Sequence, residues 1–191
     1  MNEISRQADK SRREAEQVLS DADLLYTPNE VDLAIDRMAQ EISVVLADKN
    51  PIVICLMLGA IIPTGKLLTH LQFPLQLEYV HATRYRGETT GGKLKWIKKP
   101  RTNLKDRMVL VIDDILDEGI TLSSIINECR DAGAEKIYTA VLVNKITNRQ
   151  KHIEKADFTG LTVPDRYVFG CGMDYKEYLR NCPGIYAVKD K

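Results

Sequence analysis

The chain has no surplus of charge of either sign and no long hydrophobic run. Its 191 residues include 27 Lys or Arg and 27 Asp or Glu, so the molecule as a whole has no electrostatic reason to bind nucleic acid or an anionic membrane. No apolar run approaches the ~20 residues that span a bilayer. Residues 1–17 are polar and lack the apolar core of a secretory signal. We therefore expect neither nucleic acid nor a membrane as partner, and a cytoplasmic location.

Cysteine and histidine are scarce, and their spacing excludes the common metal and redox motifs. The cysteines stand at positions 55, 129, 171 and 182, and no pair has the Cys-x-x-Cys spacing of a zinc or redox site. Cys55 lies in an apolar run and Cys129 in a helical pattern, as expected for small buried hydrophobic residues. The histidines, at positions 70, 81 and 152, also lack metal-ligand spacing, and we expect them to be structural or exposed.

The remaining composition is that of an ordinary globular protein. Hydrophobic residues make up 44% of the chain and charged residues 28%, both typical values. A chain of this length can bury a real core without disulfides, so we predict that residues 1–191 form one domain. Segment 93–107 is locally basic, with seven Lys or Arg. A solvated hairpin with its linker is the favoured interpretation, and a polyanion site is the alternative.

Hydrophobic periodicity predicts alternating helices and strands, the pattern of an α/β fold. Residues 27–30 combine an N-cap threonine, a proline in the first turn and a glutamate three residues after the cap, which together begin a helix. From Asp157 onward the pattern changes to short strands and turns. The predicted helices are 3–20, 28–48, 63–71 and 121–132, and the predicted strands are 52–58, 75–82, 108–113, 137–143, 158–163, 167–169 and 185–188.

The most informative stretch lies between Val109 and Ile125. An apolar, β-branched run ends in Asp113 and Asp114, and a short loop with a glycine then leads to Thr121 and a helical pattern. Such a run is typical of a strand buried in a parallel sheet. Open α/β sheets place their ligands at the carboxyl ends of these strands, and a helix start attracts anions. Carboxylates beside an anion site indicate a phosphorylated sugar together with a metal ion.

This stretch resembles the phosphoribosyl diphosphate signature of type I phosphoribosyltransferases. The segments 142–149 and 163–180 are similar to the purine-binding half of the hypoxanthine-guanine members, and the loop 56–60 to their diphosphate-binding loop. The resemblance runs from about residue 50 to 188. It implies a central, mainly parallel sheet flanked by helices, the core at about 30–150. A small hood, from about 1–25 and 155–191, would cover the carboxyl edge of the sheet.

The same resemblance implies a reaction and its partners. The expected activity is purine salvage, in which the 5-phosphoribosyl group of phosphoribosyl diphosphate is transferred to hypoxanthine or guanine with release of diphosphate. Mg²⁺ is the expected cofactor, and a homodimer or homotetramer is the expected assembly. The sequence does not rank hypoxanthine, guanine and xanthine.

The resemblance also assigns the sugar-phosphate contacts. Asp113 and Asp114 would bind the ribose hydroxyls, and with Asp174 they would lie near the metal. Asp117 would be the catalytic residue, exchanging a proton with the purine N7. The 5-phosphate would lie on the segment made of Asp117, Glu118, Gly119, Ile120 and Thr121. Thr121 could equally be a plain helix N-cap.

Two positions in the phosphate segment depart from the family pattern. Glu118 stands where the family has Thr or Ser, and Ile120 where Lys is frequent. A carboxylate near a phosphate repels it, so we expect Glu118 to point to solvent and to contribute only its N–H.

The remaining assignments concern the diphosphate, the purine and a lid. Leu58, Gly59 and Arg180 would bind diphosphate, although Leu58 stands where the family often has Lys, and a strained or cis peptide is expected at Leu58–Gly59. The residues assigned to the purine are Lys145 at its 6-oxo group, Tyr167 stacked on its face, and Val168 and Asp174 at its edge. Arg84 and Tyr85 would belong to a mobile lid. For the turn at 87–92 an ordinary hairpin is the alternative.

Two other classes of protein compete with the enzyme. A regulatory protein of the same fold could sense phosphoribosyl diphosphate and bind RNA or DNA, but the purine-reading residues are present and the net charge is zero. A phospho-signalling receiver also has paired acids after an apolar strand. Its later strand would end in a phosphorylated Asp, whereas here that strand ends in Asn144 and Lys145.

Overall fold

The computed structural model describes residues 3–84 and 94–189, and its largest feature is a six-stranded sheet in the order β4-β3-β2-β5-β6-β7. Neighbouring strands pair in parallel, except that the edge strand β4 is antiparallel to β3. This confirms the predicted fold class. The strands are β2 (Ile52–Met57), β3 (Gln76–Arg84), β4 (Leu94–Lys98), β5 (Met108–Leu116), β6 (Lys136–Lys145) and β7 (Phe158–Val163).

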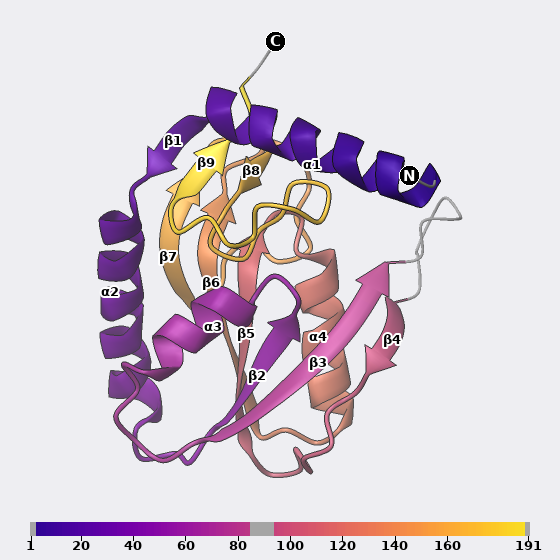
Figure 1. Cartoon of the computed structure of the whole chain (residues 1–191). Helices are drawn as coiled ribbons and strands as arrows, with labels where there is room; N and C mark the ends of the chain where they lie inside the picture. The colour runs from indigo at the N-terminus through magenta and orange to yellow at the C-terminus, as the bar shows by residue number, and fades with distance from the viewer. Residues whose placement is uncertain (1–2, 85–93, 190–191) are drawn as a thin grey trace.

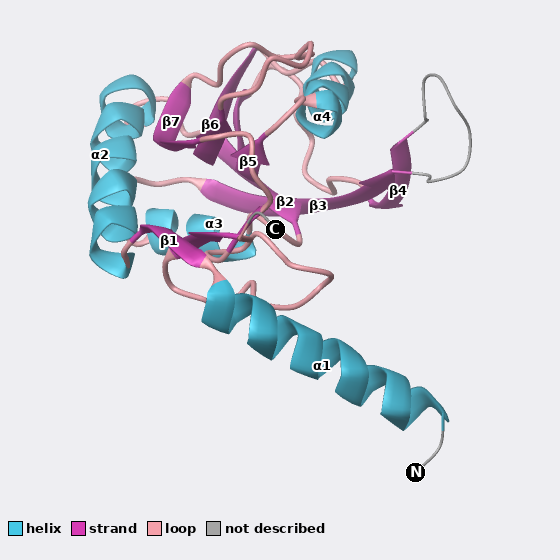
Figure 2. Ribbon diagram, turned by 90° about the horizontal axis from the view of Figure 1, so that it is seen from above, coloured by secondary structure: helices cyan, strands magenta, loops and turns pink. Residues whose placement is uncertain are grey.

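Helices cover both faces of this sheet (Figures 1 and 2). On one face lie α2 (Pro28–Leu46) and α3 (Ile61–Leu68), and on the other lies α4 (Ile120–Asp131). The predicted capping box is confirmed, because the Thr27 side chain accepts from the Glu30 N–H and the Glu30 side chain accepts from the Thr27 N–H. A cap of this kind stabilises a helix by roughly 1 kcal/mol, so α2 begins where the sequence indicates.

A second, three-stranded antiparallel sheet lies at the carboxyl end of the main strands. Its strands are β1 (Asp23–Tyr26), β9 (Ile185–Ala187) and β8 (Val168–Phe169), and α1 (Glu3–Asp21), which precedes β1, projects away from the main sheet (Figure 2). These elements form the expected hood. The expectation was wrong for β7, which pairs with β6 in the main sheet. The reason is packing: α2 covers β7 at Gly160, where an added Cβ would lie 2.9 Å from the Met38 sulfur.

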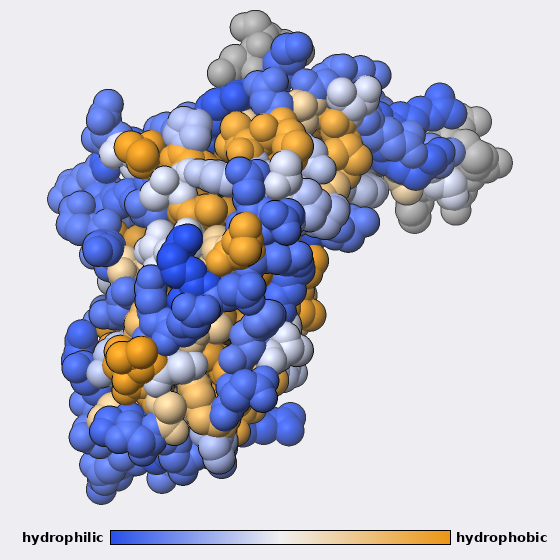
Figure 3. Space-filling model, turned by 90° about the vertical axis from the view of Figure 1, so that its left-hand side faces the viewer, coloured by the Kyte–Doolittle hydropathy of each residue, from blue (hydrophilic) through white to orange (hydrophobic). Residues whose placement is uncertain are grey.

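One buried cluster includes residues of both sheets, among them Val111 of β5, Val168 of β8 and Ile185 of β9. We infer that the two sheets form one domain. Figure 3 shows the side of the molecule that carries α2, where hydrophilic surface is interrupted by separate apolar patches. Within residues 3–84 and 94–189, no helix combines the length and the apolar character needed to cross a membrane.

Strand β3 reverses the burial that its alternating sequence suggests. Leu77 and Tyr79 are 57% and 46% exposed, whereas Glu78 is only 9% exposed. The Glu78 carboxylate pairs with Lys98 and accepts hydrogen bonds from the N–H groups of Arg101 and Thr102. Burial alone would raise the pKa of Glu78, but these donors outweigh it and lower the pKa to about 2. The carboxylate therefore fastens the segment after β4 to the sheet.

This ion pair predicts a pH-dependent contribution to stability. The pKa of Glu78 is lowered from 4.5 to about 2 in the folded state, so its contribution is complete above pH 4.5 and is lost as the pH falls toward 2. Glu78→Gln should lower the free energy of unfolding by roughly 1–3 kcal/mol at pH 7, and by less at pH 3, in urea titrations. Glu135→Gln, at an exposed position, is the control. An equal loss at both pH values would contradict this account.

Candidate active site

A cavity of about 270 Å³ opens at the carboxyl ends of β2 and β5. It contains most of the residues that the sequence assigned to ribose, phosphate, diphosphate and metal. The predicted residues that line it are Gly59, Asp113, Asp114, Asp117, Gly119, Ile120, Thr121, Asp174 and Arg180. They come from three separate parts of the chain, which the sheet edge and the hood bring together.

The paired acids lie inside β5, because this strand continues to Leu116 and not, as expected, to residue 113. The Asp113 carboxylate accepts from the Asp114 N–H at 2.9 Å, and the Asp114 carboxylate accepts from the Ile115 N–H at 2.8 Å. Burial raises the pKa of Asp114, while its hydrogen bonds and the nearby Arg180 oppose that rise. Two acids fixed in a strand therefore line the cavity with oriented oxygen atoms.

The loop after β2 makes close backbone contact with these acids. A Cβ added at Gly59 would lie 1.9 Å from Asp114 Oδ2, and one added at Gly172 would lie 2.0 Å from the Gly59 carbonyl oxygen. A side chain at position 59 would have to displace the Asp114 carboxylate, whereas one at position 172, where φ is 107°, would collide with the backbone itself. The expected cis peptide is found one residue earlier than expected, at Met57–Leu58; neither bond precedes a proline, so the sequence carries no signal for either.

The predicted phosphate segment forms the start of α4. Gly119 is the N-cap, with φ of 76°, and the helix begins at Ile120. The alternative role of Thr121 as N-cap was therefore wrong, because the N-cap is the glycine two residues earlier. The first turn of an α-helix has N–H groups without acceptors inside the helix, and Ile120 and Thr121 line the cavity. This end of the cavity suits an anion.

Asp117 lies between two cations. Its Oδ2 is 3.2 Å from the Lys145 ammonium, and its Oδ1 is 2.8 Å from the Arg149 guanidinium. Lys145 ends β6 and is 8% exposed. Its position is fixed by Lys151, which donates to the Lys145 carbonyl at 2.8 Å. A nearly buried ammonium and a carboxylate are thus held side by side next to the cavity.

The expectation that Glu118 points to solvent was wrong. Its carboxylate pairs with Arg149 at 2.9 Å, and its carbonyl accepts from the His152 N–H at 2.7 Å. Arg149 also binds Asp165 at 2.9 Å. Neither Arg149 nor Asp165 was among the residues predicted for the site. A usable signal was present for Arg149, because it follows a predicted strand that ends at the same edge of the sheet as β5. Asp165 follows β7, whose place in the main sheet was not expected.

The loop 170–180 brings Asp174 and Arg180 to the cavity. The two side chains pair at 2.7 Å, and Arg180 also donates to the Gly172 carbonyl at 2.7 Å. Several residues of this loop that are not glycine have left-handed backbone conformations: Cys171, Lys176, Glu177 and Leu179. Such strain is concentrated at functional sites. The predicted diphosphate-binding arginine is therefore paired with the predicted metal-proximal acid.

Three further predicted residues, Leu58, Tyr167 and Val168, do not line the cavity itself. Tyr167 is 52% exposed and forms an edge-on contact with Tyr175 at 5.6 Å, while Val168 is buried and pairs with Ala187. Leu58 is 48% exposed. Of the lid residues, Arg84 ends β3, its side chain is not described, and Tyr85 lies outside the described residues, as does the turn at 87–92.

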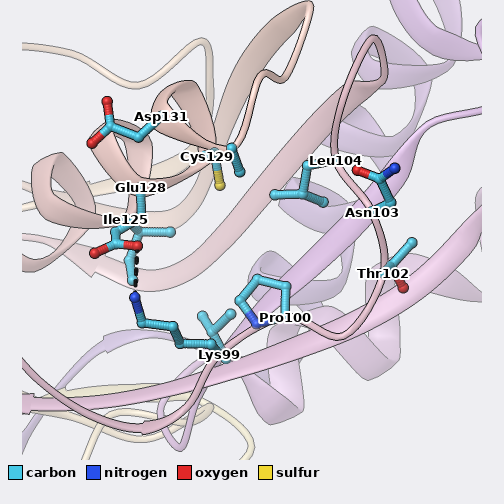
Figure 4. A pocket seen from close by; sticks show the side chains of 11 residues that line it. Lys99, Pro100, Thr102, Asn103, Leu104, Ile125, Glu128, Cys129 and Asp131 are labelled. Carbon is cyan, nitrogen blue, oxygen red and sulfur yellow. Dashed lines mark hydrogen bonds and ion pairs between the residues drawn. The ribbon is translucent and has the colours of Figure 1, made fainter.

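A second cavity, of about 380 Å³, lies between α4 and the segment 99–104 (Figure 4). Ile125 and Leu104 give it apolar walls, and Lys99 pairs with Glu128 at 3.1 Å. Burial raises the pKa of the Cys129 thiol there to about 11, so this thiol is not a nucleophile at neutral pH. The second cavity has neither adjacent acids of one strand nor the start of a helix in its lining, whereas the first has both.

The chain is similar to known proteins over most of its length. The family model of the phosphoribosyl transferase domain matches residues 22–177. The hypoxanthine-guanine-xanthine phosphoribosyltransferase of Tritrichomonas foetus is 31% identical over 87% of this chain and 91% of its own length. The hypoxanthine-guanine enzyme of Bacillus subtilis is 32% identical over 87% and 92%. A crystal structure of a Staphylococcus aureus hypoxanthine phosphoribosyltransferase superposes with a TM-score of 0.83 at 26% identity, covering 89% of this chain and 93% of that one.

The contact between Gly59 and Asp114 can be tested with two glycines. Gly59→Ala should displace the Asp114 carboxylate and lower the free energy of unfolding by roughly 1–3 kcal/mol in denaturant titrations. Gly65→Ala is the matched control, because its added Cβ meets nothing within 4 Å and alanine is the better helix former by about 1 kcal/mol. Equal stability of the two variants would show that the close contact has no consequence.

Proposed function

Because the chain belongs to the type I phosphoribosyltransferase family, as a purine-salvage phosphoribosyltransferase related to the hypoxanthine-guanine enzymes, we propose that it transfers the 5-phosphoribosyl group of phosphoribosyl diphosphate to hypoxanthine or guanine. The purine nitrogen N9 forms a bond to C1 of the sugar while the C1–O bond to diphosphate breaks. The bonding electrons leave with the diphosphate. The proton on purine N7 passes to Asp117.

The pair formed by Lys145 and Asp117 carries this proposal. Their charged groups are 3.2 Å apart, and they offer a donor beside an acceptor. The edge of a 6-oxopurine that carries an N7 proton offers the complementary arrangement, with O6 as acceptor and N7–H as donor. Adenine presents an amino group in place of O6, which leaves the ammonium without an acceptor. A site with unpaired buried polar groups rejects such a ligand strongly, so the pair selects 6-oxopurines.

The other residues position the sugar and its charged groups. Asp113 and Asp114 accept hydrogen bonds from the ribose hydroxyls, and the segment 117–121 binds the 5-phosphate through backbone N–H groups at the start of α4. Leu58, Gly59 and Arg180 bind the diphosphate. Tyr167 stacks on the purine, with Val168 and Asp174 at its edge. Arg84 and Tyr85 belong to a lid that excludes water from the cation-like sugar centre.

Mg²⁺ is the proposed cofactor. Within residues 3–84 and 94–189, no group of three or more His, Cys, Asp or Glu is arranged to hold a metal by itself. Mg²⁺ needs no such group, because it binds through one or two carboxylates with substrate oxygens and water. Asp113, Asp114 and Asp174 line one cavity and would supply the carboxylates. Mg²⁺ bound there would supply stabilisation of the negative charge on the departing diphosphate.

We also propose a homodimer or homotetramer in the cytoplasm. The exposed side chains of Leu77 and Tyr79 border a cavity of about 340 Å³ that continues over Ile61 and Leu68 of α3. Apolar patches of this kind often mark protein interfaces. All four cysteines lie in described segments and are free thiols, which suits a reducing compartment.

The reaction is tested by incubating the protein with hypoxanthine or guanine, phosphoribosyl diphosphate and Mg²⁺, and by measuring nucleoside monophosphate and diphosphate. Both products should form in equal amounts, and adenine should not be used. Absence of nucleotide with every 6-oxopurine, from folded protein that binds phosphoribosyl diphosphate, would favour the regulatory alternative.

Asp117→Asn tests the proton transfer. Removing a general base lowers turnover by roughly 10²- to 10⁴-fold, while the dissociation constant of phosphoribosyl diphosphate, measured by calorimetry, should change little. Turnover close to that of the unmodified enzyme would show that Asp117 is not the proton acceptor.

Lys145→Met tests the selection of the base. Loss of one partner from a buried charged pair should lower kcat/KM for hypoxanthine and guanine by roughly 10²- to 10³-fold. Binding of phosphoribosyl diphosphate should be retained, because Lys145 does not line the cavity assigned to the sugar phosphate. If kcat/KM for the bases and the affinity for phosphoribosyl diphosphate fell together, the substitution would have damaged the fold instead.

A further inference from the structure

One guanidinium joins three carboxylates beside the cavity. Arg149 Nη2 binds Asp117 Oδ1 at 2.8 Å and Asp165 Oδ1 at 2.9 Å, and Arg149 Nη1 binds Glu118 Oε1 at 2.9 Å. The Thr147 hydroxyl donates to Asp165 at 2.8 Å and accepts from the Arg149 N–H at 3.1 Å. A planar guanidinium can hold several carboxylates in a fixed arrangement, which a lysine cannot.

Glu118 creates a difficulty that this cluster resolves. It lies one residue before Gly119, the N-cap of α4, in the segment assigned to the 5-phosphate. A free carboxylate there would repel the phosphate, since two negative charges a few ångströms apart and partly shielded from water interact strongly. The side chain of Glu118 is only 30% exposed, so water screens its charge incompletely. Its pairing with Arg149 holds the charge outside the cavity lining.

The carboxylate of Asp117 must also be held in a fixed direction, because a proton acceptor has to be oriented toward the purine. One of its oxygens is bound by Arg149 and the other lies near Lys145. A purine that binds to Lys145 through O6 then meets the second oxygen of Asp117, while the first stays fixed by Arg149. The loop that carries Arg149 is itself fastened to the phosphate segment, through the hydrogen bond from the His152 N–H to the Glu118 carbonyl.

We propose that Arg149 is a positioning residue with two separable effects: it orients the proton-accepting carboxylate of Asp117, and it holds the carboxylate of Glu118 away from the 5-phosphate of the substrate. This inference rests on the proposed function. Asp165 and Thr147 fix the guanidinium from its other side. The arrangement allows this chain to have glutamate in a segment whose task is to bind an anion.

The test is a double-mutant cycle with Arg149→Ala, Glu118→Gln and the combined variant. Kinetics give kcat, and calorimetry gives the dissociation constant of phosphoribosyl diphosphate with Mg²⁺. Arg149→Ala should raise that constant about tenfold and lower kcat about 10- to 100-fold, because an unpaired carboxylate faces the phosphate and Asp117 loses its orientation. In the Glu118→Gln background, Arg149→Ala should raise the constant less than about threefold while kcat still falls.

Arg130→Ala is the control, since Arg130 is an exposed arginine on α4 that donates to Asn127 at 2.7 Å, outside the site. The inference is overturned if the binding loss is the same in both backgrounds, or if Arg149→Ala lowers kcat no more than Arg130→Ala does. Thermal unfolding separates these results from a loss of fold. If the unmodified enzyme forms nucleotide and Asp117→Asn does not, either contrary outcome removes only the role of Arg149 and leaves the proposed function in place.

Discussion

The contact between the Asp114 carboxylate and the backbone of Gly59 fixes the geometry of the site. It joins the end of β5 to the loop after β2, and Gly172 brings the hood loop against the same glycine. Three parts of the chain that are far apart in sequence therefore meet at Gly59, one through the Asp114 carboxylate and one through the backbone of Gly172. Because protein interiors are close-packed, a shift of any one of these parts would move the acids, the diphosphate loop and Arg180 relative to one another.

The charged residues around the site form local groups of ion pairs and do not make one region of a single sign. Lys145 and Arg149 face Asp117, Glu118 and Asp165, while Arg180 faces Asp174. The acids are thereby held in fixed directions before any substrate binds, which avoids reorganisation during the reaction. Glu118 departs from the family pattern of Thr or Ser. Its charge is paired because the loop after β6 supplies Arg149.

Much of the fold could be predicted because its signals are local. The capping box at Thr27 begins α2 as expected, and the apolar run before Asp113 is a buried strand. The errors occurred where packing decided. Strand β7 was expected in the hood, but no feature of a short strand's sequence specifies which other strand it pairs with. Likewise, the alternation at Leu77 and Glu78 shows that β3 has two faces, but it does not show which face is covered.

By itself, the sequence determined the helices α1 to α4 and the strands β2, β3 and β5 to β9, although it did not indicate the strands β1 and β4. It also determined the paired carboxylates of β5 and the glycine turn into α4, because each of these features depends on residues that are neighbours along the chain. Only the tertiary structure decided that Arg149 binds Asp117, Glu118 and Asp165, and that Arg180 binds Asp174. The physical reason is that a charged side chain can be satisfied by any opposite charge that folding brings within reach, and that choice depends on distances in space that the order of residues does not specify.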